Sequence, residues 1–235
     1  MCGRFTLTPD LDALQMAFPW VPIPPEITPR YNIAPSQPVA VIPNEEPPRW
    51  DFFTWGLIPS WAKDPVIGSR MINARAETLA EKPSFRSAYL RRRCLIPADG
   101  FFEWQSVPGR KGKIPLYFRL KSGKPFAFAG LWELWHTPDG SEIRSCTIIT
   151  TEPNEMIAQV HNRMPVILPP EAYPAWLATG EVKPDRLQPL LVPYPAEEMT
   201  SVEVTNAVNN PSLDAPVCVE PERDLGARGS SPQLI

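Results

Sequence analysis

Hydrophobic residues along this chain gather in short runs, and prolines or glycines separate one run from the next. Runs rich in valine, isoleucine and aromatic residues, bounded in this way, are typical of β-strands. They predict strands at residues 38–43, 50–58, 93–97, 100–105, 115–120, 126–134, 144–151 and 164–168.

Apolar residues at helical spacing occur only in short segments, so we expect few and short helices. Ser84 is the expected N-cap of one helix, and Pro153 and Pro170 are expected to open two others. Strands outnumber helices and do not alternate regularly with them. The pattern predicts an α+β fold, a single domain with a curved, mostly antiparallel, barrel-like β core and a few short flanking helices. The expected helices are 10–18, 77–81, 84–92, 153–159 and 170–178.

Proline accounts for 32 of the 235 residues, an unusually large share. Because proline removes a backbone donor and breaks the interior of a helix, a helical bundle is excluded. Hydrophobic residues still make up 43% of the chain, enough to build one buried core. We therefore expect one domain over residues 1–222 and a flexible C-terminal tail over residues 223–235.

Charge is distributed unevenly, although the formal net charge is only −3. Residues 61–93 carry eight basic and three acidic side chains, whereas residues 194–235 carry seven acidic and two basic ones. The basic stretch is compatible with a site for an anion, and equally with a solvated helix face.

The four cysteines lie far apart in the sequence, without the close cysteine or histidine pairs that a zinc site needs. We expect reduced thiols at all four. No phosphate loop, dinucleotide fingerprint or metalloprotease motif occurs, so we expect no cofactor and no metal. The chain contains neither an apolar signal segment at its start nor an apolar run long enough to span a membrane. These features predict a cytoplasmic protein without a membrane partner. The cysteines are Cys2, Cys94, Cys146 and Cys218.

Cys2 directly follows the initiator methionine, and removal of Met1 would make it the N-terminal residue. An N-terminal cysteine carries an amine and a thiol on adjacent carbons. The amine is partly neutral at pH 7 and attacks an aldehyde to give a Schiff base. The thiol then closes on the imine carbon and gives a thiazolidine ring. The alternative is an incidental cysteine near a frayed chain end.

Three further segments hold residue types suited to chemistry. Asn73 could orient a substrate, and Arg75 beside it could bind a phosphate. Glu103 lies between two aromatic residues, where burial would raise its pKa and favour proton transfer. His161 and Arg163 follow a predicted helix, and histidine suits acid–base chemistry near neutral pH. The plainer alternatives are a polar turn, a strand residue on the wet face and a structural histidine.

Six segments together resemble the SRAP family (SOS response-associated peptidase-like proteins), whose members crosslink to abasic sites in DNA. The resemblance covers the chain from residue 1 to about residue 210, with the segments in the family's order. They are Met-Cys-Gly-Arg-Phe at 1–5, Arg-Tyr-Asn-Ile-Ala-Pro at 30–35, Trp-Gly-Leu-Ile-Pro-Ser-Trp at 55–61, Ile-Asn-Ala-Arg-Ala-Glu-Thr at 72–78, Arg-Cys-Leu-Ile-Pro-Ala-Asp-Gly-Phe-Phe-Glu-Trp at 93–104 and His-Asn-Arg-Met-Pro at 161–165.

The resemblance implies a DNA-repair protein in which Cys2, after loss of Met1, captures the ring-opened sugar of an abasic site in single-stranded DNA as a thiazolidine. It also implies an enzyme that removes its own Met1, with AP-lyase activity, acting in the SOS response. Independently of the resemblance, we expect a monomer by default. Ala62 stands where some members carry a second tryptophan, so part of the aromatic wedge is expected to be missing. The implied catalytic residues are Cys2, Asn73, Glu103 and His161, the DNA-binding residues are Arg4, Trp61, Arg75 and Arg163, and the pocket residues are Asn32 and Pro35, while the basic stretch adds Arg86.

Two other functions remain open from the sequence. Cys2 could be an N-terminal nucleophile whose own amine acts as the base, as in a cysteine peptidase or amidohydrolase. The chain could also be a noncovalent single-stranded nucleic-acid binding module, because basic and aromatic residues alone suffice for that function. The abasic-site function is favoured because it accounts for all six segments.

Overall fold

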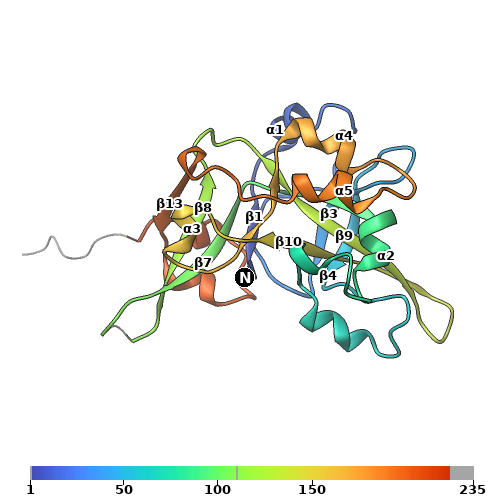
Figure 1. Cartoon of the computed structure of the whole chain (residues 1–235). Coiled ribbons are helices and arrows are strands. Elements are labelled where there is room, and N and C mark those ends of the chain that lie inside the picture. The colour runs from blue at the N-terminus through green and yellow to red at the C-terminus, as the bar shows by residue number, and fades with distance from the viewer. Residues whose placement is uncertain (1, 110, 223–235) are drawn as a thin grey trace, which may run out of the picture.

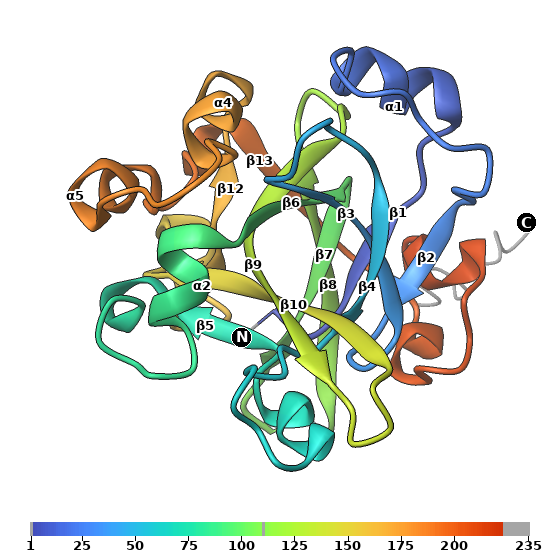
Figure 2. The same ribbon diagram turned by 90° about the vertical axis from the view of Figure 1, so that its right-hand side faces the viewer.

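Five strands form a closed barrel at the centre of the molecule. The structure is a computed structural model and describes residues 2–109 and 111–222. Around the barrel, β4 pairs with β3, β3 with β6, β6 with β9, β9 with β10, and β10 returns to β4. All pairs are antiparallel except β10 with β4. Figure 2 shows these strands around the centre of the view. They are β3 (Pro38–Pro43), β4 (Asp51–Trp55), β6 (Arg93–Ala98), β9 (Phe126–His136) and β10 (Glu142–Thr151).

A second, antiparallel sheet lies against the barrel, in the strand order β13-β8-β7-β1-β2. Figure 1 shows β1 between β7, β8 and β13 on one side and the barrel strands on the other. Three short strands, β5, β11 and β12, extend the barrel sheet at β10 and β9. The second sheet consists of β1 (Phe5–Leu7), β2 (Arg30–Ile33), β7 (Gly100–Ser106), β8 (Lys113–Leu120) and β13 (Met199–Glu203), and the short strands are β5 (Asn73–Arg75), β11 (Met164–Pro165) and β12 (Ile167–Leu168).

Aromatic side chains join the two sheets. The ring of Phe5 on β1 lies 5.1 Å from that of Trp55 and 5.7 Å from that of Phe128. Phe101 on β7 also contacts Phe128, at 6.1 Å. Buried aromatic pairs of this kind add about 0.5–1.5 kcal/mol each beyond the burial of their area. The start of the chain is therefore anchored in the core.

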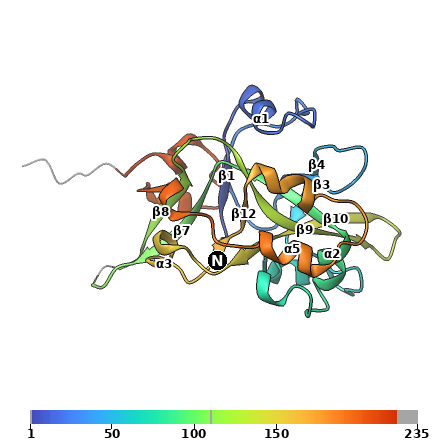
Figure 3. The same ribbon diagram turned by 45° about the horizontal axis from the view of Figure 1, so that its top comes forward.

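Short helices cover the periphery, as Figure 3 shows for α1, α2 and α5. Asp10 caps α1, where its side chain accepts a hydrogen bond from the amide of Ala13. Among the described residues, no helix has the length and apolar character needed to cross a bilayer. The helices are α1 (Leu11–Ala17), α2 (Arg86–Arg91), α3 (Glu155–Ala158), α4 (Tyr173–Trp176) and α5 (Pro184–Leu187), with 3-10 helices at Pro65–Arg70, Ala76–Thr78, Pro170–Ala172, Gln188–Leu190, Ala196–Glu198, Asn206–Asn209 and Pro216–Val219.

The predicted fold class is confirmed: one α+β domain with a barrel core, an antiparallel sheet and short helices. The predicted strand at 164–168 is divided in two, because β11 pairs with β10 while β12 pairs with β9. The predicted tail, residues 223–235, lies outside the described residues.

Three predictions about the helices were wrong, two about where a helix begins and one about whether a helix forms. Ser84 does not cap α2, whose N-cap is Phe85 without a capping side chain. Pro153 does not open α3, because the side chain of Asn154 caps that helix at the amide of Ile157. The segment predicted as a helix at 77–81 contains only a 3-10 turn, Ala76–Thr78.

Candidate active site

Cys2 lies in the interior, three residues before β1 begins at Phe5. Its Sγ is 3.8 Å from the carbonyl oxygen of Arg4, and that carbonyl accepts a hydrogen bond from the amide of Phe102 at 3.0 Å. The first described residues therefore continue alongside β7. The thiol of Cys2 is thus held against a strand, and the alternative of a frayed chain end is excluded.

Glu103 on β7 is the acidic group beside this thiol. It is buried, with 4% of its surface exposed, so it does not face solvent as the plainer interpretation supposed. Burial raises the pKa of Glu103, and the nearby His161 and Lys113 oppose that shift. Burial and the charge of Glu103 in turn raise the pKa of the Cys2 thiol. Cys2, Glu103 and His161 therefore form one electrostatically connected group, in which the thiol stays protonated at neutral pH.

His161 lies in a tight turn after α3. The backbone amide of Arg163 donates a hydrogen bond to Nδ1 of His161 at 3.0 Å. When the ring is neutral, its proton is therefore on Nε2. The turn thus fixes the orientation of the imidazole and the nitrogen that carries the proton.

Asn73 begins β5, which pairs in parallel with β10 and places Asn73 opposite Ile148. The side-chain amide nitrogen donates to the carbonyl of Ile72 at 3.0 Å. Its Oδ1 is buried and accepts no hydrogen bond from any described residue. Buried polar atoms normally have a partner, so this oxygen is suited to accept a hydrogen bond from a substrate.

The end of β10 brings two of the predicted segments together. Thr150 is the register partner of Arg75 on β5 and of Pro165 on β11. The carbonyl of Thr150 also accepts a hydrogen bond from Nη2 of Arg163 at 2.6 Å. The guanidinium of Arg163 pairs with both carboxylate oxygens of Glu77. Arg163 is therefore tied to protein groups, whereas Arg75 is exposed and forms no salt bridge with any described residue.

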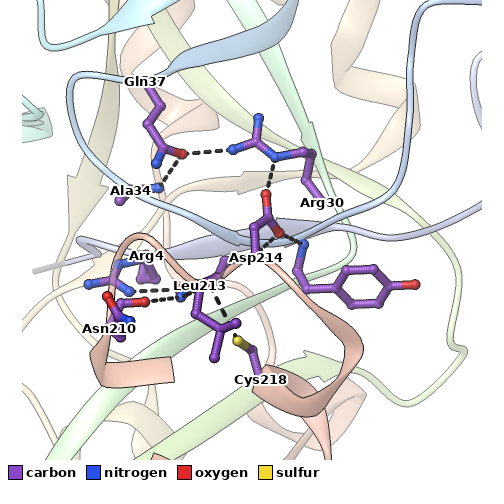
Figure 4. A network of polar contacts seen from close by, with 10 residues as sticks. Arg4, Arg30, Ala34, Gln37, Asn210, Leu213, Asp214 and Cys218 are labelled. Carbon is purple, nitrogen blue, oxygen red and sulfur yellow. Dashed lines mark hydrogen bonds and ion pairs between the residues drawn. The ribbon is translucent and has the colours of Figure 1, made fainter. Parts of the chain in front are cut away.

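Arg4 and Asn32 belong to a polar network that fastens the 206–219 segment to the start of the chain (Figure 4). Nη1 of Arg4 donates to Oδ1 of Asn32 at 2.6 Å and to the carbonyl of Val208 at 2.7 Å. The Asn32 amide donates to three carbonyls of this segment, those of Val208, Asn210 and Leu213. Burial lowers the pKa of Arg4. Both residues hold the backbone around Cys2, and half-buried Pro35 lies in the turn after β2.

A family model for the SOS response associated peptidase (SRAP) matches residues 1–211. The chain belongs to the SRAP family. The SRAP protein YoqW of Bacillus subtilis (strain 168), named an abasic site processing protein, is 49% identical over 223 residues, or 94% of this chain and 99% of the relative. HMCES of Pongo abelii, also named an abasic site processing protein, is 32% identical over 216 residues, or 77% of this chain and 60% of that protein.

Solved structures show the same SRAP architecture. A crystal structure of a protein from Bacteroides thetaiotaomicron superimposes with a TM-score of 0.83 at 26% identity and covers 94% of this chain and 100% of that one. A second, from Bordetella bronchiseptica, gives a TM-score of 0.75 at 26% identity and covers 87% of this chain and 100% of that one.

Trp61 of this SRAP chain projects from an excursion between β4 and β5. Its ring is exposed and borders a surface hollow of about 300 Å³ that Lys63, Val66 and Arg70 also line. Ala62 points inward instead, and its carbonyl accepts a hydrogen bond from Nε1 of Trp135 at 2.7 Å. Position 62 therefore belongs to the buried side of this segment. Of the two neighbouring positions, only Trp61 exposes an aromatic ring.

The basic stretch at 61–93 separates into two groups in this SRAP fold. Arg93 is fully buried and donates to the carbonyls of Tyr89, Leu90, Trp176 and Ala178, and burial lowers its pKa to about 10. Arg91 and Arg92 form ion pairs with Glu181 and Glu133. The exposed cations that form no salt bridge with any described residue are Lys63, Arg70, Arg75, Lys82 and Arg86.

One residue of this site was not among the sequence-based candidates. Glu77 binds Arg163, but the sequence offers only its place two residues after Arg75 as a signal. Among the described residues, no cluster of three or more histidine, cysteine or acidic side chains could hold a metal ion.

Proposed function

We propose that this protein processes abasic sites in single-stranded DNA by forming a covalent crosslink through Cys2. The proposal is supported by the relatives named abasic site processing proteins, one of them 49% identical over 94% of this chain. The observation that carries it is the buried Cys2 thiol, whose pKa is raised by burial and by the charge of nearby Glu103, while His161 acts in turn on the pKa of Glu103. An ordinary core cysteine would not lie next to a buried carboxylate and a histidine.

The reaction begins with hydrolysis of the peptide bond between Met1 and Cys2, which consumes one water and frees the amine of Cys2. The amine adds to the aldehyde of the ring-opened abasic sugar, and loss of one water gives the imine. The thiol then adds to the imine carbon, and its proton moves to the imine nitrogen. The product is a thiazolidine whose mass equals the trimmed protein plus the DNA minus one water.

Glu103 is placed to move protons in these steps. Because burial raises its pKa, its carboxylate is a better base than an exposed one and its acid form is accessible nearer to neutral pH. It would take a proton from the amine of Cys2 and return it to the hydroxyl that leaves as water. It would also assist the removal of Met1, which makes the peptidase activity a reaction of the protein on itself.

Asn73 and His161 are assigned to the sugar. The free Oδ1 acceptor of Asn73 would hold a sugar hydroxyl, since no described residue donates to it. The Nε2–H of His161 would donate to the sugar or to the neighbouring 3′ phosphate and assist ring opening. Strand cleavage through the imine, the AP-lyase reaction, would transfer a proton from C2′ of the sugar to the carboxylate of Glu103 and expel the 3′ phosphate, to which the Nε2–H of His161 would donate.

Single-strand binding is assigned to the exposed cations and to Trp61. Backbone-tracking cations together with an aromatic surface are what a single strand needs when it is bound without sequence preference. Arg75 and Arg86 are exposed and form no salt bridge with any described residue, and Trp61 presents its ring to solvent. Arg4 and Arg163 would contribute through the shape of the site, since both bind protein groups.

The test is incubation of the purified protein with single-stranded DNA that contains one abasic site, followed by a denaturing gel and intact mass. We expect a shifted band with the mass of the thiazolidine for the wild type and none for Cys2→Ala. Cys218→Ala, which removes another buried thiol, should crosslink normally. A wild-type band that never shifts would overturn the crosslinking proposal.

Three further measurements distinguish the crosslinking function from the two competing functions. Retention of Met1 in a Glu103→Gln precursor and its loss in the wild type would support self-processing. Turnover of an added peptide would favour a general N-terminal-nucleophile hydrolase instead. Binding that survives Cys2→Ala without any covalent band in the wild type would favour a noncovalent single-strand binder.

A further inference from the structure

The pair formed by Glu77 and Arg163 is better built than an ordinary surface salt bridge. Glu77 has 56% of its side chain exposed, but only 12% of the Arg163 side chain is exposed. The contact is bidentate, and Nη2 of Arg163 also donates to the carbonyl of Thr150 at 2.6 Å. Bidentate pairs between arginine and carboxylate fix geometry as well as adding energy. The hydrogen bonds from Arg163 hold the pKa of Glu77 below its usual range.

This pair is connected to the histidine through one backbone hydrogen bond. Glu77 holds the side chain of Arg163. The backbone amide of Arg163 donates a hydrogen bond to Nδ1 of His161 at 3.0 Å. Movement of the Arg163 side chain would move the short turn from His161 to Arg163. That movement would release Nδ1 and let the imidazole change its orientation.

The connection continues to the reactive residue. His161 lies close enough to Glu103 to oppose the rise of its pKa, and Glu103 in turn raises the pKa of Cys2. A series of direct contacts and charge interactions therefore runs from the exposed carboxylate of Glu77, through Arg163, His161 and Glu103, to the buried thiol. Glu77 is the outermost of these five residues and the only one of them whose side chain is more than half exposed.

We propose that Glu77 is a positioning residue: its carboxylate holds Arg163 against β10, and this fixes the turn that orients the imidazole of His161 toward Glu103. The inference rests on the proposed crosslinking function for its consequence in catalysis. It also assigns Arg163 a structural task, because a DNA phosphate that took this guanidinium would have to displace Glu77. Groups that orient metal-bound histidines change affinity or activity by about 10–100-fold when they are removed, and we expect an effect at the lower end of this range for the positioning of His161.

The structural part of the proposal is tested without DNA by nuclear magnetic resonance. The chain has two histidines, so His136→Gln leaves His161 as the only imidazole. In this background we expect a ¹⁵N–¹⁵N coupling across the hydrogen bond between the Arg163 amide and Nδ1 of His161. Glu77→Ala should abolish the coupling, and Glu77→Gln, which keeps one acceptor, should weaken it.

The matched control is Glu181→Ala. Glu181 also has 56% of its side chain exposed and also pairs with an arginine, Arg91, outside this series of contacts. It should leave the coupling and the crosslinking rate unchanged. A coupling that persists in Glu77→Ala would overturn the proposal, whatever the outcome of the crosslinking test.

The functional part is tested by separating rate from affinity. At saturating abasic DNA, Glu77→Ala should crosslink about tenfold more slowly than the wild type, and Glu77→Gln should fall between the two. Reversible affinity, measured in a Cys2→Ala background, should not fall, because positioning affects the reaction more than binding and loss of Glu77 frees the guanidinium of Arg163 for a phosphate. An unchanged rate, or a loss of affinity as large as the loss of rate, would overturn the assignment. Absence of any wild-type crosslink would instead count against the proposed function, and the resonance test would still decide the role of Glu77.

Discussion

Glu103 and Glu133 are equally inaccessible, each with 4% of its surface exposed, but their surroundings differ. The carboxylate of Glu133 on β9 forms an ion pair with Arg92 at 2.7 Å. At Glu103 burial prevails over the nearby positive groups, so its pKa is raised. Glu133 is therefore held in an ion pair, whereas Glu103 is arranged to exchange its proton.

The two residues should respond in opposite directions to the same substitution. Because the folded-state pKa of Glu103 lies above the unfolded value, its contribution to stability is complete in acid and is lost as pH rises through the folded-state pKa. Glu103→Gln should therefore raise the free energy of unfolding by roughly 1 kcal/mol at about pH 8 and leave it unchanged at about pH 4. Glu133→Gln should lower it by about 1–3 kcal/mol near neutral pH, since Arg92 loses its partner.

Urea unfolding of both variants over a range of pH is the measurement. A stabilised Glu103→Gln that no longer crosslinks would show a site whose chemistry lowers stability, as functional sites often do. A Glu103→Gln variant that is destabilised at high pH would contradict the expected increase in the free energy of unfolding.

At the scale of the elements, two glycines allow the segment between β4 and β5, which contains Trp61, to pack closely against the barrel. A Cβ atom on Gly68 would lie 2.6 Å from the carbonyl oxygen of Gly56, which is too close for any side chain. Gly68 belongs to the 3-10 helix Pro65–Arg70, and Gly56 follows β4. The close approach of these two backbones fixes where the excursion leaves the barrel.

Gly68→Ala should therefore cost about 1–3 kcal/mol of stability through overpacking. Since the excursion must shift to relieve the contact, reversible DNA affinity in a Cys2→Ala background should also fall. Hydrogen exchange over residues 57–71 reports the loosening directly, and Ser69→Ala, at the exposed neighbouring position, is the control. Unchanged exchange in Gly68→Ala would show that the backbone contact is not what holds the excursion.

The longer strands could be predicted from the sequence because their apolar residues are consecutive and Pro or Gly marks their ends. The prediction for β3, Pro38–Pro43, had the observed bounds. The strands β1, β2, β5 and β13 were missed because each has three to five residues and takes its partner from a distant part of the chain. Such strands have no local signal, since the tertiary pairing alone makes them strands.

The site was less predictable than the fold from residue patterns alone. Alternation along β7 left open whether Glu103 faced water, and only the second sheet packed on the barrel decides that it is buried. Within the basic stretch, the sequence places Arg93 in a strand and Arg86 in a helix but does not show that Arg93 is buried on four backbone carbonyls while Arg86 is exposed. Long-range contacts decide what a charged residue does.

At the scale of the whole molecule, we expect DNA binding to depend on the exposed cations rather than on the net charge of −3. Each phosphate of a single strand that a cation neutralises contributes roughly −0.7 to the slope of log K against log salt concentration. In a Cys2→Ala background, the double variant Arg75→Gln/Arg86→Gln should make this slope less negative by roughly 1.4.

The control removes the same charge elsewhere. Arg49→Gln/Arg91→Gln takes away two arginines that already pair with Glu45 and Glu181. The slope should hardly change, because these guanidiniums release no counterions from DNA. Equal effects of the two double variants would show that total charge, and not the exposed set, determines affinity.

The network in Figure 4 has a consequence for how the protein is made. Arg4 binds the carbonyl of Val208, 204 positions further along the chain, so this contact cannot form until residue 208 has been synthesised. At the usual synthesis rate of about 5–20 residues per second, this delay is roughly 10–40 s. Until then the segment after Cys2 lacks this anchor, although Glu103 and His161 precede Val208 in the chain. A nascent chain that stops before residue 208 would therefore lack this anchor beside Cys2, and the network forms only once the 206–219 segment has been made.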